Sequence, residues 1–459
     1  MWIRLILCFV FSLALVPAHV RRTLADDIND ELVQLVVNLL GDSDKDMRAL
    51  GYEQIRTEAP GKAATEKFAT LLQEVPPQTR VGLLSALADR GDNSARPAVV
   101  ELLQTQPTPA VRIAAIRALG LLGTTRDTPR FVEYVSQGTA DERTAAIASL
   151  VALRGDDVSK AIAQQMKGAG PDTQVELIRV LTTRRALDVI PDLLQAALGA
   201  DATVRSAAMQ ALGELGNADQ IPGMVQGVLK AKRGAEQAAA EKNLMFVCRR
   251  TAQPDQQADA LLDAMDQLNA ADQVTLLSSL GRVGGPSALK VIEQALHDRK
   301  QHSAGLRALC NWPDASVAPQ LIEVVKTDKH RGHGTTALRA LIRIAPLPDG
   351  RTDLQKLDLL KQAMQLCQRD QERKLALKRA SAIRVPETLR FVLPYLDQPG
   401  FTEQACETIV ELAHHRNLRE PNEAEFHQAL DRVIATSKNA TVVDRANRYK
   451  RDETWVRPK

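Results

Sequence analysis

Apolar residues recur along the chain in a pattern that repeats about every 31 residues. The repeat is clearest between VRIAAIRALGLLG, from Val111 to Gly123, and VRSAAMQALGELG, from Val204 to Gly216. A unit of this length holds two helices of about a dozen residues and two short turns, so it predicts one helical hairpin. The leucine of the Ala-Leu pair serves as a landmark, which lies at Ile55, Leu87, Leu119, Leu150, Leu181, Leu212, Leu244, Leu280, Leu309, Leu341, Ala380 and Val410.

Positions near the landmark support this register. Large apolar residues lie three positions before it, which is the i, i+3 spacing of a buried helical stripe. Proline is tolerated in a first helical turn, and it precedes the landmark by 21 or 22 residues at Pro97, Pro129, Pro191, Pro222 and Pro319. We therefore predict an all-α chain, an α-solenoid or superhelix of about 12 stacked antiparallel helical hairpins, with longer loops near residues 248–256 and 345–352.

The segment from Asp201 to Gly216 reads DxxVRxAAxxALGxLG. In this motif the chain resembles the HEAT repeat, and specifically its short phycobilisome-lyase-type variant, over roughly residues 28–416. The resemblance implies a solenoid with a concave ligand-binding groove, and it implies no particular reaction. Tetratricopeptide repeats have a similar length, but their Trp, Leu-Gly and Tyr pattern is missing.

The N-terminus has the pattern of a secretory signal peptide. Arg4 precedes an apolar run from Leu5 to Val16, which is too short to span a bilayer comfortably. Cleavage after Ala25 is preferred and cleavage after Ala18 is the alternative; retention as an anchor is a further one. We expect a periplasmic or secreted protein with no membrane span after cleavage.

We predict three regions: a signal peptide at 1–25, the HEAT-like solenoid at 26–418, and a capping helix with a basic tail at 419–459. The helix is expected at 421–436. The tail that follows has six basic and two acidic residues from Arg445 to Lys459. A solvated, disordered end is the simpler interpretation, and a docking peptide is the alternative.

Charge and cysteine content exclude some classes of protein. Loss of residues 1–25 leaves 56 basic against 56 acidic residues, so the mature chain lacks the positive excess that nucleic-acid binding usually needs. Four cysteines then remain, in different repeats and without a CxxC motif. Buried free thiols are favoured over disulfides. They are Cys248, Cys310, Cys367 and Cys406.

No motif predicts a catalytic, cofactor or metal site. Asp42, Asp44, Asp46 and Glu53 have the spacing of calcium ligands in an EF-hand, but Met47 occupies the glycine position. His330 and His333 share a loop without a third ligand nearby in sequence. No histidine precedes glutamate, as in the HEAT-like deoxyhypusine hydroxylase, and the GxSxG, P-loop and HExxH motifs do not occur. We therefore predict a protein that is not an enzyme and binds no cofactor.

Two basic columns follow the repeat. The first is expected to be structural, pairing with turn acids or with carbonyls of the adjacent unit. It consists of Arg48, Arg80, Arg112, Arg143 and Arg205. The second lies two residues before the landmark and is expected to face the groove. Its binding candidates are Arg179, Lys242, Arg307, Arg339 and Lys378.

These observations predict a non-catalytic protein-interaction scaffold, exported from the cytoplasm, whose groove is basic in its C-terminal half. The expected partner is a protein or an anionic polymer. An ordinary solvated face of lysine and arginine is the competing interpretation of this column. The alternative functions are a HEAT-like enzyme or enzyme subunit, lyase-like or metal-dependent, and a structural partner of an envelope complex.

Overall fold

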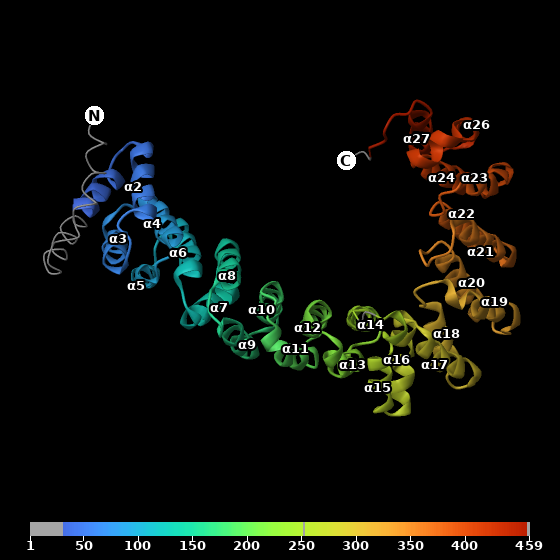
Figure 1. Cartoon of the computed structure of the whole chain (residues 1–459), viewed down its shortest axis with the longest axis horizontal. Coiled ribbons are helices and arrows are strands. Elements are labelled where there is room, and N and C mark those ends of the chain that lie inside the picture. Colours follow the sequence, from blue (N-terminus) through green and yellow to red (C-terminus); the bar gives the residue numbers. More distant parts are fainter. Residues whose placement is uncertain (1–30, 251–252, 457–459) are drawn as a thin grey trace, which may run out of the picture. The chain divides into compact units, whose positions relative to one another are not determined.

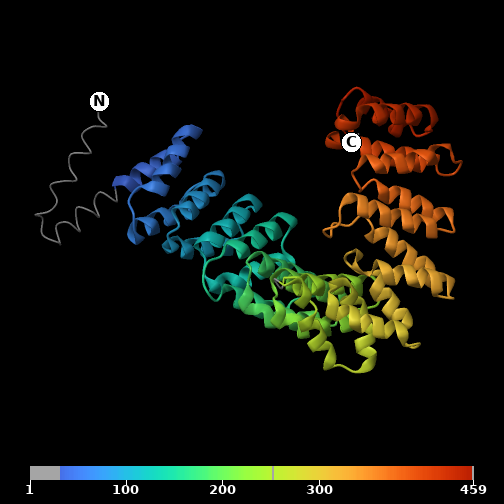
Figure 2. The same ribbon diagram turned by 45° about the vertical axis from the view of Figure 1, so that its right-hand side comes forward.

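The computed structural model describes residues 31–250 and 253–456. It comprises two compact units, the first ending at Gly216 and the second beginning at Asn217. The expected signal peptide, residues 1–25, lies outside the described residues. All regular structure in the described ranges is helical (Figure 1). Within each unit, helical hairpins stack on one another in chain order, which confirms the predicted α-solenoid class (Figure 2).

The first unit alternates first and second helices of successive hairpins. Residues 31–40 are helical and form the first helix of the first hairpin. Leu39 and Leu40 lie against Gly51 of the second helix of that hairpin. The second helices are α2 (Lys45–Thr57), α4 (Pro77–Arg90), α6 (Pro109–Leu122), α8 (Ala140–Ala152), α10 (Pro171–Thr183) and α12 (Ala202–Leu215). The first helices between them are α3 (Lys62–Glu74), α5 (Arg96–Gln104), α7 (Thr128–Gln137), α9 (Val158–Gly168) and α11 (Ile190–Ala197).

The second unit continues the alternation and ends in three further helices. Its first helices are α13 (Ile221–Lys230), α15 (Asp259–Asp266), α17 (Pro286–His297), α19 (Ala318–Thr327), α21 (Asp353–Leu366) and α23 (Pro386–Val392). Its second helices are α14 (Ala235–Cys248), α16 (Ala270–Val283), α18 (His302–Cys310), α20 (Arg331–Ile344), α22 (Asp370–Ala380) and α24 (Thr402–Ala413). The C-terminal helices are α25 (Arg416–Arg419), α26 (Glu423–Thr436) and α27 (Ala440–Lys450).

All twelve landmark residues lie in second helices, and each has 0% of its surface exposed. The predicted register is therefore confirmed. The five prolines are also where the sequence predicts them, in the first turns of α5, α7, α11, α13 and α19. Burial of the landmark leucines, each stabilising by about 1.5–3 kcal/mol, provides a repeated contribution from every hairpin. None of the described helices has the length and apolar character that a membrane span requires.

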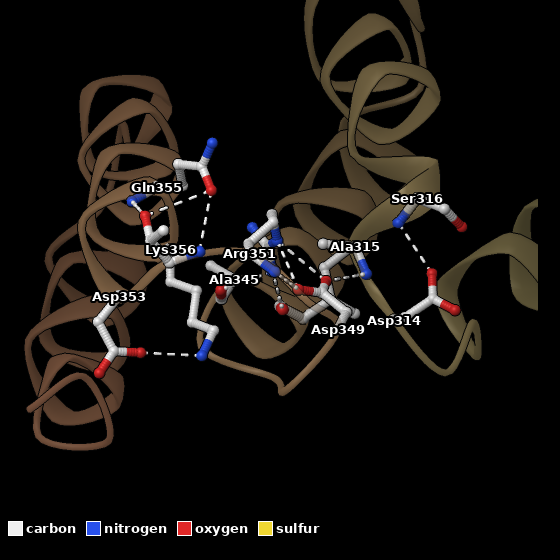
Figure 3. A network of polar contacts seen from close by, with 11 residues as sticks. Asp314, Ala315, Ser316, Ala345, Asp349, Arg351, Asp353, Gln355 and Lys356 are labelled. Carbon is white, nitrogen blue, oxygen red and sulfur yellow. Dashed lines mark hydrogen bonds and ion pairs between the residues drawn. The ribbon is translucent and has the colours of Figure 1, made fainter.

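An ordered loop joins α20 to α21, where the longest interval between landmarks predicts an extended connection. Asp349 accepts hydrogen bonds from Arg351 Nε at 2.8 Å and from the backbone N–H of Ala315 at 3.2 Å (Figure 3). Arg351 also donates to the carbonyl oxygen of Ala345 at 3.0 Å. Because Ala315 lies at the start of the preceding hairpin, just before its first helix, the Asp349 carboxylate hydrogen-bonds this loop to that hairpin.

The C-terminal region differs from the prediction. The capping helix is present as α26, but residues 440–450 form α27 instead of a solvated tail. Tyr449 is only 2% exposed, and its hydroxyl lies 2.9 Å from Nδ1 of His414, the residue that follows α24. Arg445 pairs with Glu411 on α24 at 2.6 Å. The expectation of a disordered end is wrong for α27 because Val442, Ala446 and Tyr449 form a buried stripe that packs the helix onto its own chain.

Candidate functional site

Four of the five predicted groove residues lie on second helices of the second unit. Lys242, Arg307, Arg339 and Lys378 are all solvent-exposed, on α14, α18, α20 and α22. Each of these helices packs on the next, with α16 between α14 and α18. We call the exposed face of α14, α16, α18, α20 and α22 the second-helix surface. The chain therefore presents one cation at the same repeat position of four helices on it.

Two carboxylates of these helices, Glu372 and Glu241, are withdrawn from solvent. Glu372 is 2% exposed and accepts hydrogen bonds from Arg339 Nε at 2.9 Å and from Arg369 Nη2 at 2.7 Å. Burial alone would raise the pKa of Glu372, but the hydrogen bonds from Arg369 and Arg339 hold this pKa below its usual value. Since two guanidinium groups share one carboxylate, the cluster keeps a net positive charge at the surface.

A second buried carboxylate explains why α16 carries serine at the column position. Glu241 is 6% exposed and accepts hydrogen bonds from Ser278 Oγ and from Arg282 Nε, both at 3.0 Å. The other acidic residues of these second helices lie in first turns, where they suit the helix dipole. They are Glu236, Asp272 and Asp370. The middle of the second-helix surface therefore has exposed positive charge and buried negative charge.

An exposed aromatic residue adjoins the column. Phe246 lies one turn after Lys242 on α14, is 44% exposed, and has its ring centroid 5.6 Å from Lys242 Nζ. A large apolar side chain beside a cation can anchor a partner by burial and by cation–π attraction.

Arg179 is placed differently from the other four predicted residues. It lies in the first unit, on α10, and pairs with Glu176 on the same helix at 2.8 Å. Its charge is therefore compensated locally by an exposed i, i+3 ion pair.

The predicted structural arginines make two kinds of contact. Arg48, Arg80 and Arg205 donate to backbone carbonyls of the turn just before their own second helix; for Arg205 the acceptors are Gly199 and Ala200, at 3.0 and 2.6 Å. Arg112 instead pairs with the buried Glu142 of the next hairpin. Arg143 is exposed. Three arginines of this column therefore hydrogen-bond to the turn of their own hairpin, and Arg112 forms an ion pair with the adjacent hairpin.

Three polar side chains from two hairpins meet in the second unit. His302 begins α18, Asp328 follows α19, and His333 lies in the first turn of α20. Asp328 Oδ2 is 2.9 Å from His302 Nε2 and 3.0 Å from His333 Nδ1. The expectation that His330 and His333 lack a further ligand nearby is wrong, because stacking of adjacent hairpins brings His302 to the loop.

The electrostatics of this cluster favour an ionised carboxylate. Burial alone would raise the pKa of Asp328, but hydrogen bonds from the His330 amide, His302 and His333 hold it below its usual value. The pKa of His302 is raised by its hydrogen bond to the Leu296 carbonyl and then by Asp328. The cluster opens onto a cavity of about 470 Å³ that is also lined by Leu296, His297, Arg299, Ser303, Val324 and Thr327.

Comparison with known families decides what the repeated hairpins are. The family model described as HEAT repeats matches residues 65–151 and 159–245. These two stretches are HEAT repeats. No curated protein matches the sequence.

Solved structures resemble this chain at low identity. Those of Kap121p bound to Nup53p, of the karyopherin Kap121p bound to the extreme C-terminus of the protein phosphatase Cdc14p, and of importin beta in an ammonium sulfate condition are each 13% identical to it. Their TM-scores are 0.48, 0.46 and 0.41, and the matches cover 92%, 92% and 91% of this chain. They cover 53%, 57% and 60% of the other chains, so this chain spans between half and three fifths of their length.

The acidic loop of the first hairpin has a structural role. Asp44 is the N-cap of α2, and its carboxylate accepts the Asp46 N–H at 2.9 Å. Asp42 in turn accepts the Asp44 N–H at 2.8 Å. The carboxylates of Asp42 and Asp44 thus bind backbone donors at a helix start, which accounts for their spacing.

The four cysteines in residues 31–250 and 253–456 are free thiols, as predicted, and three are buried while Cys310 is half-buried. Burial raises the pKa of Cys248 to about 12 and those of Cys310 and Cys367 to about 11. Thiols with such pKa values are poor nucleophiles at neutral pH.

A further set of arginines escaped the sequence analysis. Each lies two or three residues after its landmark and donates to carbonyls at the C-terminal end of the preceding second helix, where intrahelical donors are missing. Arg184 Nη1, for example, donates to the carbonyls of Leu150, Val151 and Leu153, each at 2.8 Å. Arg90 and Arg343 do the same for α2 and α18. The sequence did carry a sign of this role, because an arginine recurs two or three residues after the landmark. The carbonyls that accept its hydrogen bonds lie more than 30 residues earlier in the chain.

Proposed function

We propose that this HEAT-repeat chain is a non-catalytic scaffold whose second-helix surface binds an acidic segment of a protein partner. One observation carries the proposal: exposed cations recur at one repeat position, while Glu241 and Glu372 on the same helices are buried. An acidic segment lying across α14 to α22 would meet Lys242, Arg307, Arg339 and Lys378 in turn. Such charge complementarity contributes mainly to association rate and specificity.

Affinity would come chiefly from Phe246. An exposed aromatic ring beside a cation has the properties of an interface hot spot, because its burial removes a large apolar surface from water. An acidic polysaccharide offers charge without an apolar side chain to cover this ring. The pairing of Phe246 with Lys242 therefore favours a protein partner over an anionic polymer.

Export remains part of the proposal and rests on the sequence alone. We propose that residues 1–25 direct the chain out of the cytoplasm, to the periplasm or beyond, and are removed, leaving the solenoid at 26–418 and the C-terminal region at 419–459. Assignment of the repeats to the short phycobilisome-lyase-type variant is likewise a proposal, supported by the DxxVRxAAxxALGxLG spacing from Asp201 to Gly216.

A capture experiment from the extracytoplasmic fraction tests the function. The test variant is K242E/R307E/K378E, which leaves Arg339 in place because it pairs with the buried Glu372. The matched control is K230E/K290E/K326E, which reverses three exposed lysines on the first helices α13, α17 and α19. Both variants change net charge equally. Wild type and control should capture the same partner and the test variant should lose it; capture by all three proteins rejects the second-helix surface as the binding site.

A further inference from the structure

The His302, Asp328 and His333 cluster joins two successive hairpins by side chains that commonly bind metals. Its ligand atoms all lie within 4.8 Å of one another. Both histidine nitrogens that face the carboxylate approach the same oxygen, Asp328 Oδ2. Two imidazoles and one carboxylate form a ligand set suited to first-row divalent transition metals.

Surrounding hydrogen bonds orient two of these ligands. His302 Nδ1 lies 2.7 Å from the Leu296 carbonyl oxygen, and a carbonyl can only accept, so Nδ1 carries a proton. In the neutral imidazole this leaves the Nε2 lone pair directed at Asp328. The other oxygen of Asp328, Oδ1, accepts the backbone N–H of His330 at 2.8 Å. In metal sites, a hydrogen bond from the non-coordinating nitrogen of a histidine, or to the non-coordinating oxygen of a carboxylate, typically holds the ligand in its orientation.

The spacing requires little rearrangement. Around a tetrahedral zinc ion with bonds of about 2.0–2.2 Å, neighbouring ligand atoms lie about 3.4 Å apart. The two N···O distances here are 2.9 and 3.0 Å. An ion entering the cluster would therefore replace both hydrogen bonds after each nitrogen moves away from Asp328 Oδ2 by a few tenths of an ångström, while the two nitrogens, within 4.8 Å of each other, settle to about 3.4 Å.

The site is accessible and has room for a fourth ligand. The side chains of His302, His333 and Asp328 are 32%, 24% and 12% exposed. They border the cavity of about 470 Å³, which gives an ion a path of entry. The exposed His330 has its ring centroid 4.4 Å from that of His333, so His330 or a water molecule can complete the coordination.

We propose that His302, Asp328 and His333 bind a divalent transition-metal ion of the zinc class. Since His302 belongs to one hairpin and the other two ligands to the next, the ion would cross-link adjacent repeats. It would also fix α18 relative to α20, the helices that carry Arg307 and Arg339. This inference is independent of what the second-helix surface binds.

Metal titration of the whole purified chain, stripped with chelator, tests the proposal. The wild type should bind one equivalent of Zn²⁺ by calorimetry, and Co²⁺ should give the visible absorption of a four- or five-coordinate site. H302Q/H333Q and, separately, D328N should weaken Zn²⁺ binding by about 100-fold or more. The control H427Q, whose side chain has the same 32% exposure as His302, should bind like wild type.

Two results would overturn the site. One is a wild type that shows no visible Co²⁺ band, which does not depend on how any variant folds. The other is Zn²⁺ binding by H302Q/H333Q, or by the near-isosteric D328N, equal to that of wild type while circular dichroism shows unchanged helix content.

Discussion

Gly281 lets two second helices approach closely. A Cβ added there would lie 2.6 Å from the carbonyl carbon and 2.7 Å from the Cα of Ala308, so α16 and α18 touch backbone to backbone. Backbone atoms cannot turn aside as a side chain can. The small residues in the repeat are therefore needed for contact between hairpins and not merely tolerated in it.

The substitution G281A should destabilise the second unit by about 1–3 kcal/mol through overpacking. Gly168 provides the control, because no atom lies within 4 Å of the Cβ added to it. G168A should change the free energy of unfolding by less than about 1 kcal/mol. Urea unfolding measures both. Equal effects of the two substitutions would contradict the close-contact interpretation.

Glu372 should make stability depend on pH in the acid range. Its pKa is below the ordinary value, so its stabilising contribution is present above the unfolded pKa of about 4.3 and is lost as the pH falls through the lower folded value. E372Q should cost about 1.5–3 kcal/mol at pH 7 and flatten the loss of stability on acidification. The exposed pair of Glu425 with Arg390 is the comparison, and E425Q should have a much smaller effect. Urea unfolding between pH 3 and pH 7 measures these effects; equal pH dependence in wild type and E372Q would count against the buried pair.

Within an element, the sequence determines most of what the structure shows. The landmark positions and first-turn prolines predicted the second and first helices because a buried helical stripe has a fixed period. Contacts between hairpins were harder to predict. His302 and Asp328 are 26 residues apart, and only the stacking of α18 on α20 brings them together. Helix α27 was missed because the side chains of Tyr449 and Arg445 have their partners in and just after α24, 35 and 34 residues away.

The arginines that cap preceding helices should hold the ends of those helices. R184M removes three hydrogen bonds to the C-terminal carbonyls of α8 and should cost about 1.5–3 kcal/mol. Hydrogen exchange should then accelerate at the end of α8 and at the hairpin that follows. R143M is the control, since the Arg143 side chain is exposed and forms no hydrogen bond or ion pair with residues 31–250 and 253–456. If R184M leaves exchange at α8 unchanged, the capping role is wrong.

At the scale of the whole molecule, the positions of the charged side chains say more about binding than the net charge does. Residues 26–459 are formally neutral by their sequence, yet the second-helix surface places its exposed cations on four helices of one unit. The sequence predicted which residues these are from their repeat position. It could not show that Glu241 and Glu372 would be buried beneath the surface, because burial depends on how neighbouring hairpins pack.

The central claim is that this surface recognises acidic chains by position and not by net charge. Fluorescence titration with labelled poly-L-glutamate at low salt tests it most directly, using wild type, K242E/R307E/K378E and K230E/K290E/K326E. We predict that reversal on the second helices weakens binding by about tenfold or more, while reversal on the first helices changes it by about twofold or less. Equal weakening in both variants would contradict the account.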